Sequence, residues 1–375
     1  MKFQAIPTDV KGQRVLLRVD FNVPMEGGRV ADDFRIAATL PTIRGLAARG
    51  ARVILMTHLD MDGQRPSLRP IADHLAGHLP NVMFVDDVRG GKAEAAVSAL
   101  EDGDILLLDN LRRDDGEVAN TTEFAKRLAT FGDLYINEAF SVSHRKHASV
   151  VGVPQYLVSY AGPRFGEEVR QLSRAFDPPH PFLFILGGKK ISTKVPLLEK
   201  FLKKADTIVL GGVSAALLLK SRGFEDISVP DGEELSLMRA KFANEPKIPT
   251  PLDAVVDRGG ERLTLEPALM KAGDTMYDIG PETAGLIVRL ARESKFILWN
   301  GPVGYCEGGF TDGTRALAEA FARVNAEVIV GGGDTVRFLN AWGMLDTFSF
   351  VSTGGGAMLD FLVNETLPGI EALAK

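Results

Sequence analysis

The sequence predicts an α/β protein of two doubly wound, parallel-sheet (Rossmann-like) domains joined by a helical hinge. Short apolar runs alternate with longer stretches of helical spacing from one end of the chain to the other, which is the pattern of βαβ units. The chain has 375 residues and is 45% hydrophobic, and this length is too great for one ordinary core. A charged stretch near the middle separates two similar halves. We therefore expect two cores.

Eight short runs rich in Val, Ile, Leu and Phe have the length and composition of strands buried on both faces. They are VLLRV from Val15, RVILM from Arg52, ILLLD from Ile105, LYIN from Leu134, FLFIL from Phe182, TIVL from Thr207, FILW from Phe296 and EVIV from Glu327. Residues 35–50 and 314–326 lie between such runs and have helical spacing. Right-handed crossovers over mostly parallel sheets are therefore expected.

The chain is expected to divide into four parts: an N-terminal domain (1–162), a connecting helix (163–177), a C-terminal domain (178–360) and a tail (361–375). The stretch from Phe165 to Phe176 is charged and helical in pattern, and a proline-rich segment, 177–181, follows it. No sequence repeat of solenoid length is visible.

Charge and cysteine content restrict the class of protein. The 43 Lys and Arg residues against 49 Asp and Glu give a net charge of -6, so no basic field indicates nucleic acid or an anionic membrane as partner. The single cysteine, Cys306, can form no internal disulfide, and we assign it no chemistry. Without a signal peptide or a long apolar run, a soluble cytoplasmic protein is expected.

Ligands of open α/β sheets bind beyond the carboxyl ends of the strands, so the residues that follow each predicted strand are the first candidates. In the first half these are polar or cationic side chains, which suit a small anion held by forked hydrogen bonds. They are Asp20, Asn22, His58, Asn110, Arg112, Asn137, His144, Arg145 and His147.

The strand ends of the second half carry glycine instead: Gly187-Gly188, Gly211-Gly212, Gly301, Gly331-Gly332-Gly333 and Gly354-Gly355-Gly356. Glycine lets backbone N–H groups approach phosphate closely, as a nucleotide requires. One half thus suits a compact acidic metabolite and the other a nucleotide, and phosphoryl transfer joins the two. The candidates for neutralising the moving charge are Arg35, Lys190, Lys194 and Asp334.

Each of these features also has a purely structural reading. Glycines after strands serve tight turns, Asp334 could cap the helix after its glycines, and His147 could be a loop residue bonded to backbone. His74 and His78 lie four residues apart, as in a zinc pair, but the interval lacks the glutamate of that motif, and we assign them no function.

Thirteen ordered motifs over nearly the whole chain resemble those of the phosphoglycerate kinase family. In the first half they are RVDFNVP from Arg18, DDFRIAATLPTI from Asp32, THL from Thr57, LLLDNLR ending at Arg112, INEAF from Ile136 and SHRKHAS from Ser143. In the second half they are ILGGKKISTK from Ile185, LGGVSAA from Leu210, PLD from Pro251, DIGP from Asp278, WNGPVGYCE from Trp299, VGGGDT from Val330 and STGGGA from Ser352.

The resemblance implies reversible, Mg²⁺-dependent phosphoryl transfer between 1,3-bisphosphoglycerate and ADP, giving 3-phosphoglycerate and ATP. The implied binders of 3-phosphoglycerate are Asp20, Asn22, Arg35, His58, Arg112 and Arg145. The implied catalytic residues are Arg35, Lys190, Lys194 and Gly356, with Asp334 at the Mg²⁺ ion. The implied nucleotide binders are Lys194, Gly211, Gly212, Asn300, Glu307, Gly333, Asp334, Thr335, Gly354 and Gly355.

The resemblance also implies how the parts of the chain divide the work. The N-terminal domain would bind 3-phosphoglycerate, the C-terminal domain would bind the nucleotide, and the tail would return to the N-terminal domain. A two-lobed monomer that closes by a hinge is implied, which makes chemical sense because closure shields an acyl phosphate from water.

The sequence departs from the family at one loop that matters for the acid substrate. His58-Leu59 is followed by Asp60-Met61-Asp62-Gly63-Gln64 before Arg65-Pro66, where the family has Gly-Arg-Pro directly. An arginine that reaches the substrate is then either supplied by Arg65 or missing. Smaller departures are Glu138, Ser141, Val213 and Cys306.

The sequence bears on three alternatives to an active phosphoglycerate kinase. The altered loop and Val213 leave open a binding protein of the same fold that holds its ligands without turnover. A nicotinamide oxidoreductase is disfavoured because no Gly-x-Gly-x-x-Gly follows the first strand. A P-loop kinase is disfavoured because residues 187–194 lack the Gly-Lys-Ser/Thr ending.

Overall fold

The computed structural model describes residues 3–188, 190–229 and 232–374, and these form two compact units. One unit comprises the described residues up to Arg170 together with those from Asn364 onward, and the second runs from Gln171 to Val363. The boundaries drawn from the sequence at 162, 177 and 360 stay a prediction of functional domains.

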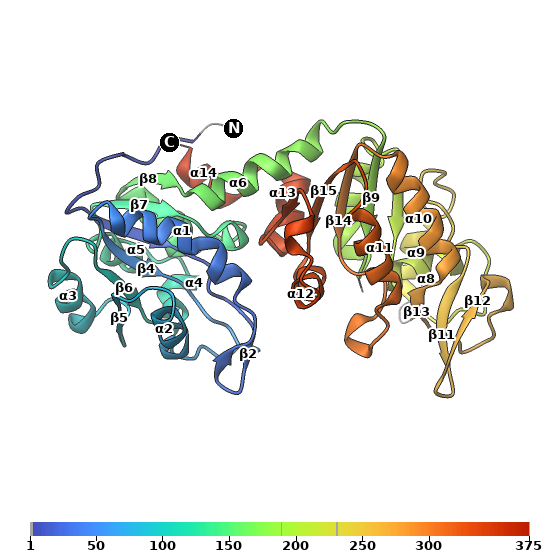
Figure 1. Cartoon of the computed structure of the whole chain (residues 1–375), viewed down its shortest axis with the longest axis horizontal. Coiled ribbons are helices and arrows are strands. Elements are labelled where there is room, and N and C mark those ends of the chain that lie inside the picture. The colour runs from blue at the N-terminus through green and yellow to red at the C-terminus, as the bar shows by residue number, and fades with distance from the viewer. Residues whose placement is uncertain (1–2, 189, 230–231, 375) are drawn as a thin grey trace. The chain divides into compact units, whose positions relative to one another are not determined.

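The N-terminal unit is built on a six-stranded parallel sheet in the order β5-β6-β4-β1-β7-β8 (Figure 1). The strands are β1 (Arg14–Arg18), β4 (Arg52–Met56), β5 (Val82–Val85), β6 (Ile105–Leu108), β7 (Leu134–Asn137) and β8 (Val158–Ala161). The chain extends from β1 to one side and from β7 to the other, so the strand order reverses between β1 and β7. Ligand sites of such sheets lie at this reversal.

The N-terminal unit also contains helices, the first three of which contact β4, β5 and β6 of this sheet. They are α1 (Phe34–Ala48), α2 (Arg69–Ala76), α3 (Gly91–Ser98), α4 (Asp115–Val118), α5 (Thr122–Ala129) and α14 (Pro368–Leu373), with α6 (Pro163–Leu172) crossing into the second unit. Ile36, Leu40 and Ile43 of α1 are buried in the same core as the apolar residues of β1 and β4. Short α14 packs on the π-helical turn Ala148–Gly152, and Gly369 N donates to Ser143 O at 2.8 Å.

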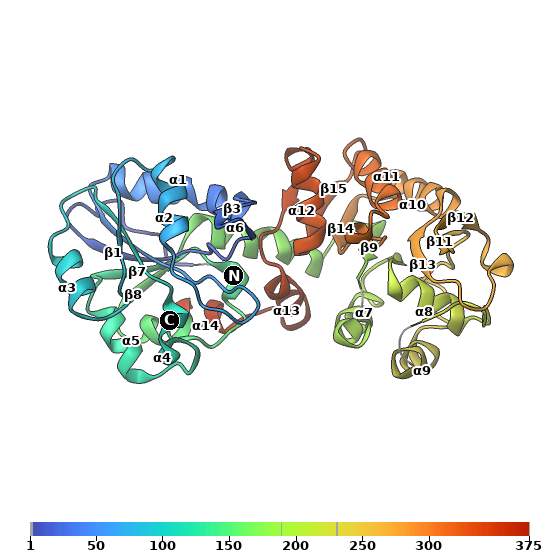
Figure 2. The same cartoon turned by 90° about the horizontal axis from the view of Figure 1, so that it is seen from below.

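The C-terminal unit has a five-stranded parallel sheet in the order β10-β9-β14-β15-β16. The strands are β9 (Phe182–Leu186), β10 (Thr207–Leu210), β14 (Phe296–Asn300), β15 (Glu327–Gly331) and β16 (Phe350–Val351). Its helices are α7 (Val195–Phe201), α8 (Val213–Ser221), α9 (Gly232–Lys241), α10 (Pro281–Glu293), α11 (Asp312–Phe321), α12 (Gly333–Ala341) and α13 (Gly356–Asn364). Helices α8 and α9 pack together, as do α10 and α11 (Figure 2). Here the strand order reverses between β9 and β14.

All eight strands predicted from apolar runs are confirmed, and the observed parallel sheets agree with the predicted α/β class. A small antiparallel sheet in the order β12-β11-β13 was not predicted. Its strands are β11 (Ala254–Arg258), β12 (Glu261–Leu265) and β13 (Met276–Ile279). A two-stranded hairpin, β2 (Met25–Glu26) and β3 (Arg29–Val30), was also missed.

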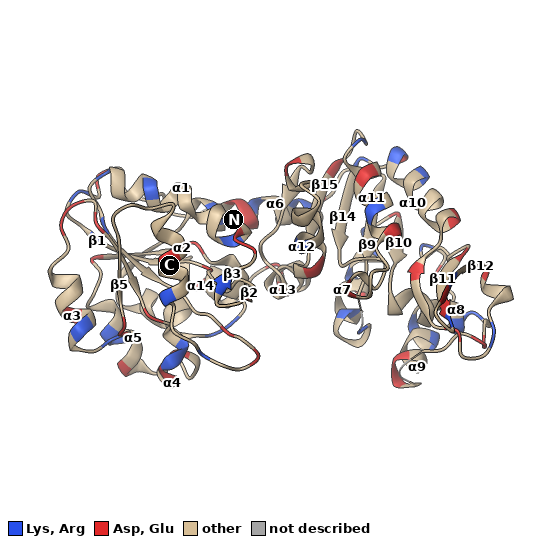
Figure 3. Cartoon of the chain, turned by 60° about the horizontal axis from the view of Figure 1, so that its bottom comes forward, with Lys and Arg blue, Asp and Glu red and all other residues tan. Residues whose placement is uncertain are grey.

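Charged residues of both signs are interspersed over both units (Figure 3). Among the described helices, none is long and apolar enough to cross a bilayer.

Candidate functional sites in the two units

In the N-terminal unit, Asp20 fixes the first turn of α1 to the carboxyl end of β1. Arg35 Nη1 lies 3.2 Å from Asp20 Oδ2 and donates to Asn22 O at 2.9 Å. Ser141 Oγ donates to the same carboxylate from the segment after β7. The Arg35 side chain is 27% exposed, so this ion pair positions a guanidinium that still reaches solvent. Asp20, Asn22 and Arg35 are thus brought together at the reversal of strand order.

Arg112 is the strongest anion-binding candidate of this unit. It lies in a 3₁₀ turn after β6, where Asn110 Oδ1 accepts from its backbone N at 3.1 Å. Its Nη1 donates to Asp60 Oδ2 at 2.5 Å, whereas Nε and Nη2 are buried and have no hydrogen-bond partner among the described groups. Leaving charged donors buried and unpaired costs a few kcal/mol, so two such donors indicate the place of an anionic ligand.

Arg18, the last residue of β1, belongs to this site, although we did not single it out from the sequence. It is 1% exposed, its Nε donates to Ser149 Oγ at 2.9 Å, and its Nη2 lies 3.2 Å from His58 Nδ1. The buried carboxylate of Glu117 accepts from Ser149 N at 2.8 Å and from Ser149 Oγ at 2.6 Å. Ser149 thus links the buried cation to a buried anion, and nothing in the local sequence around Glu117 signals this role.

Burial and neighbouring arginines lower the pKa of two histidines of the N-terminal site, His58 and His147. Burial, followed by the charges of Arg18, Arg112 and Arg145, holds the pKa of His58 well below its usual value. Burial and the charges of Arg112 and Arg145 lower the pKa of His147 to about 4. The positive charge of the site therefore comes from its arginines. Arg145 is exposed, and its Nε lies 3.3 Å from His144 Nε2.

The longer loop after His58 places a carboxylate beside the anion site. Met61 and Gln64 form a bridge, and Asp60 N donates to Asn22 Oδ1 at 2.9 Å while its carboxylate pairs with Arg112. Arg65 Nη1 pairs with Asp115 Oδ1 at 2.6 Å, and both side chains are exposed. The guanidinium of Arg65 is thus paired with Asp115. At Arg112, the carboxylate of Asp60 would compete with an anionic ligand for the guanidinium.

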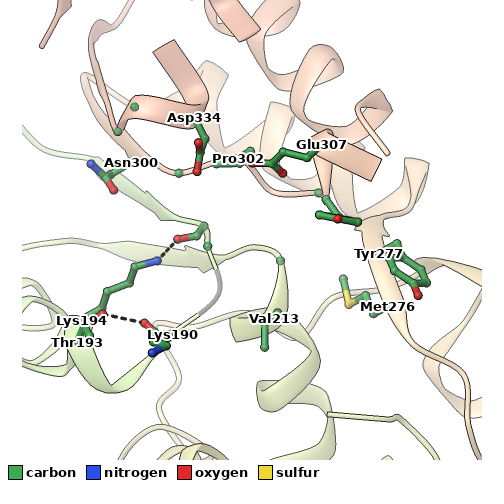
Figure 4. A pocket seen from close by; sticks show the side chains of 18 of the residues that line it. Lys190, Thr193, Lys194, Val213, Met276, Tyr277, Asn300, Pro302, Glu307 and Asp334 are labelled. Carbon is green, nitrogen blue, oxygen red and sulfur yellow. Dashed lines mark hydrogen bonds between the residues drawn. The ribbon is translucent and has the colours of Figure 1, made fainter. Parts of the chain in front are cut away.

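The C-terminal unit contains a cavity of about 400 Å³ at the carboxyl ends of β9, β10, β14 and β15 (Figure 4). Seven residues predicted to be catalytic or nucleotide-binding line it: Lys190, Lys194, Gly212, Asn300, Glu307, Gly333 and Asp334. Further lining residues not chosen as site residues are Thr193, Thr275, Met276, Tyr277, Pro302, Gly304 and Tyr305.

Two glycines keep the strand ends beneath this cavity close together. Gly187 N donates to Asn300 O at 2.8 Å, and a Cβ added to Gly187 would lie 1.9 Å from Pro302 O. Gly301 has φ +91°, and a Cβ added to it would lie 2.7 Å from Gly187 O. Side chains at either position would separate β9 from β14, so the floor of the cavity requires bare backbone.

Lys194 supplies a cation with an altered pKa. Burial lowers the pKa of its ammonium group to about 8, although the charges of Asp334 and Glu234 oppose this shift. Its Nζ donates to Gly187 O (Figure 4). Lys190 lines the same cavity, and its backbone O accepts from Thr193 Oγ1 at 3.1 Å.

Carboxylates and aromatic rings form other walls of the cavity. Arg337 Nη2 lies 3.4 Å from Glu307 Oε1 and 4.0 Å from Asp334 Oδ1, and the Asp334 side chain is 63% exposed. The Tyr277 ring stacks on Phe310 at 4.6 Å. Exposed carboxylate oxygens beside a phosphate pocket suit Mg²⁺, which prefers a few carboxylates completed by water and phosphate. An aromatic wall suits a planar base.

The remaining predicted nucleotide residues do not line this cavity. A Cβ on Gly211 would lie 2.7 Å from Val303 Cα, so close packing accounts for this glycine. Thr335 is fully buried and its Oγ1 has no partner among the described groups. Gly354, Gly355 and Gly356 lead into α13, and Met358 of this helix accepts a weak hydrogen bond from Asn300 Nδ2 at 3.6 Å.

Known proteins resemble this chain over nearly its whole length. The sequence model of the family described as Phosphoglycerate kinase matches residues 6–365. A Phosphoglycerate kinase of Desulforudis audaxviator is 42% identical over 381 residues, covering 97% of each chain, and one of Pelotomaculum thermopropionicum is 39% identical over 381 residues, also covering 97% of each.

Solved structures of the same family share the fold. The structure of phosphoglycerate kinase from Coxiella burnetii matches with a TM-score of 0.86 and 35% identity over 99% of both chains. The Phosphoglycerate Kinase from Pyrococcus horikoshii matches with a TM-score of 0.87 and 30% identity over 97% of this chain and 96% of that one. The chain belongs to the phosphoglycerate kinase family.

Proposed function

We propose that the protein catalyses reversible, Mg²⁺-dependent phosphoryl transfer between 1,3-bisphosphoglycerate and ADP, giving 3-phosphoglycerate and ATP. The proposal rests on the presence of two different sites. One unit has an arginine site with buried donors that lack partners among the described groups, and the other has a cavity with a glycine floor. A compact anion fits the first and a nucleotide fits the second. Family membership supports the same reaction, a step of glycolysis.

In the N-terminal unit, we assign 3-phosphoglycerate to the arginine site. Arg112 offers its two free donors to an anionic group, and Arg145 adds a second charge from the surface. His58, neutral and buried, serves as a hydrogen-bonding group rather than a cation. Asp20 and Asn22 orient Arg35, whose guanidinium would meet the transferring phosphoryl group.

In the C-terminal unit, we assign the nucleotide to the cavity. Lys190 and Lys194 neutralise phosphate charge, and the glycine floor lets backbone N–H groups approach the phosphates. The supporting residues carried over from the family are Gly211, Gly212, Asn300, Glu307, Gly333, Thr335, Gly354, Gly355 and Gly356. The tyrosine wall suits the base.

Asp334 is assigned to the Mg²⁺ ion that accompanies the nucleotide. Its carboxylate lines the cavity and is 63% exposed, and its ion pair with Arg337 is long, at 4.0 Å, so its oxygens remain accessible to a cation. When bound with the nucleotide, Mg²⁺ neutralises charge on the phosphate oxygens. Because the protein offers few carboxylates here, the ion would keep water and phosphate ligands.

The chemistry needs charge neutralisation and no general base. In the direction of ATP synthesis, an oxygen of the ADP β-phosphate forms a bond to the transferring phosphorus while the bond to the acyl oxygen breaks, which releases a carboxylate. Both nucleophiles, the diphosphate and the carboxylate, are already ionised. We further propose a cytoplasmic monomer in which hinge closure brings the two ligands together and excludes water.

A binding protein of the same fold is the second candidate, and the Asp60–Arg112 ion pair is the observation that favours it. Turnover and binding separate the two. Phosphorylation of 3-phosphoglycerate by ATP, followed as acyl phosphate, establishes the kinase. Calorimetric binding of both ligands at saturating concentrations without product would establish the binding protein.

A further inference from the structure

Three metal-ligating side chains converge on the N-terminal unit, outside the arginine site. His74 Nε2 lies 3.3 Å from Asp33 Oδ2, and His78 Nε2 lies 3.9 Å from the same oxygen. The two imidazole rings are 5.1 Å apart between centroids. The three ligand atoms all lie within 4.8 Å of one another.

Local structure explains why these groups meet and why they are available. His74 lies in the last turn of α2 and His78 just beyond its end, one helical turn apart, so their rings lie on the same face. Asp33 is the N-cap residue of α1, yet its side chain makes no capping hydrogen bond. His74 Nε2 is buried and has no hydrogen-bond partner among the described groups. A bound cation would satisfy both groups.

We propose that Asp33, His74 and His78 bind a divalent transition-metal ion of the zinc class. Two imidazoles and one carboxylate are the ligands that zinc takes in proteins, whereas Mg²⁺ prefers oxygen alone. With bonds of about 2.0–2.1 Å, a tetrahedral ion separates its ligand atoms by roughly 3.3–3.5 Å. The His74–Asp33 distance agrees with this value, whereas the His78–Asp33 distance of 3.9 Å is longer, so the His78 ring would have to move toward the ion on binding. Water would occupy the fourth position.

The glutamate missing between the two histidines does not argue against this site. In the metalloprotease motif that glutamate is the general base and not a ligand. Its absence excludes protease-type hydrolysis here and leaves metal binding intact. The sequence could not supply the third ligand, because Asp33 lies 41 positions before His74 and only the fold brings them together.

The ion would act as a link between two helices. It would join the residue that precedes α1 to the C-terminal end of α2, so binding stabilises the folded N-terminal unit by mass action. Asp33 stands two residues before Arg35, but the link does not depend on the kinase reaction.

Metal binding to the full chain tests the proposal directly. The chelator-treated protein is dialysed against Zn²⁺ in millimolar Mg²⁺, and four-coordinate binding is followed by the visible absorbance of Co²⁺. We expect one equivalent bound, with affinity reduced at least ~10-fold in His74→Gln, His78→Gln and Asp33→Asn. His180→Gln is the matched control, since its exposed ring pairs with Asp206 elsewhere, and it should bind as the parent does.

Thermal unfolding provides a second readout. Zn²⁺ should raise the Tm of the parent and of His180→Gln by a few degrees and raise that of His78→Gln by less at the same concentration, with circular dichroism confirming that each variant folds. The proposal is overturned if the parent binds no stoichiometric metal. It is equally overturned if all three variants keep the parent's affinity, or if His144→Gln and not His78→Gln abolishes binding.

Discussion

The two sites solve the problem of binding anions in different ways. The N-terminal site carries its charge on arginine side chains, and buried groups such as Glu117 and Asp20 hold those side chains in place. The C-terminal site depends on bare backbone at Gly187 and Gly301, with lysines added at its rim. The first should therefore be sensitive to lost charge and the second to added volume.

The largest effect is expected from adding one methyl group to the floor of the C-terminal cavity. Gly187→Ala places a Cβ against Pro302 O, so β9 and β14 must separate, and the free energy of unfolding should fall by roughly 3 kcal/mol or more. Gly333→Ala is the matched control because a Cβ there meets nothing within 4 Å, and its stability should change by less than about 1 kcal/mol. Denaturant unfolding measures both. If the two variants were equally stable, the expected sensitivity of the C-terminal site to added volume would be wrong.

Loss of charge should be nearly as damaging in the N-terminal site. Arg112→Gln removes two donors that we assign to the anion, and the affinity for 3-phosphoglycerate should fall by about 100-fold, whereas the affinity for nucleotide stays the same. Arg52→Gln is the control, since Arg52 lies at the amino end of β4, away from the carboxyl ends of the strands, and pairs with exposed Asp102. Calorimetry with each ligand separates the outcomes. An equal loss of nucleotide affinity would contradict the assignment.

Nucleotide affinity should depend on pH through Lys194. Its ammonium group has a pKa of about 8 in the free protein, and bound phosphate favours the charged form, so binding takes up a proton above this pH. The affinity should be full below pH 8 and fall by up to ~10-fold per unit above it.

Calorimetry in buffers of different ionisation enthalpy detects this proton uptake. Lys194→Arg keeps its charge throughout and should show neither the uptake nor the fall. A fall of the same size in this variant would assign the titration to another group. The N-terminal site should lack such a dependence because its charge resides on arginines.

The smallest effect is a gain. Asp60→Asn removes the carboxylate that competes with the substrate for Arg112, and the affinity for 3-phosphoglycerate should rise by ~3–10-fold, since a partly exposed ion pair contributes about 1 kcal/mol. Asp62→Asn changes the same charge at an exposed position of the same loop and should have no effect. A weaker affinity in Asp60→Asn would show instead that Asp60 positions Arg112 for its ligand.

The parts of the fold that could be predicted are those where burial leaves a pattern. Strands β1, β4, β7, β9 and β14 lie inside their sheets and have near-continuous apolar runs. Strands β5, β8 and β16 were not predicted and lie at sheet edges, and β8 even exposes Val158 at 57%. Strand β10 is also at an edge, but its apolar run TIVL is mostly buried and was predicted. The small antiparallel sheet was missed because its strands are short and mixed in composition: ERLTL of β12 has no fully buried residue, and β11 ends in Asp257-Arg258.

The same limit applies to the sites. Candidate residues at or shortly after a strand end could be predicted, because the carboxyl ends of parallel strands lie together, and Arg112, Asn300 and Asp334 are examples. Glu117, Ser149 and Tyr277 could not be found, because they reach their sites only through tertiary packing. The family motifs implied a role for each residue, but they could not show that Asp60 pairs with Arg112.

The most direct test of the central claim is turnover by the purified protein with 3-phosphoglycerate, ATP and Mg²⁺, coupled to reduction of the acyl phosphate. The account predicts steady product formation that Lys190→Ala lowers by ~10²–10³-fold, since Lys190 lines the cavity and would neutralise charge that develops during transfer. Saturating substrates with no product above the Lys190→Ala background would contradict it and leave a protein that only binds its two ligands.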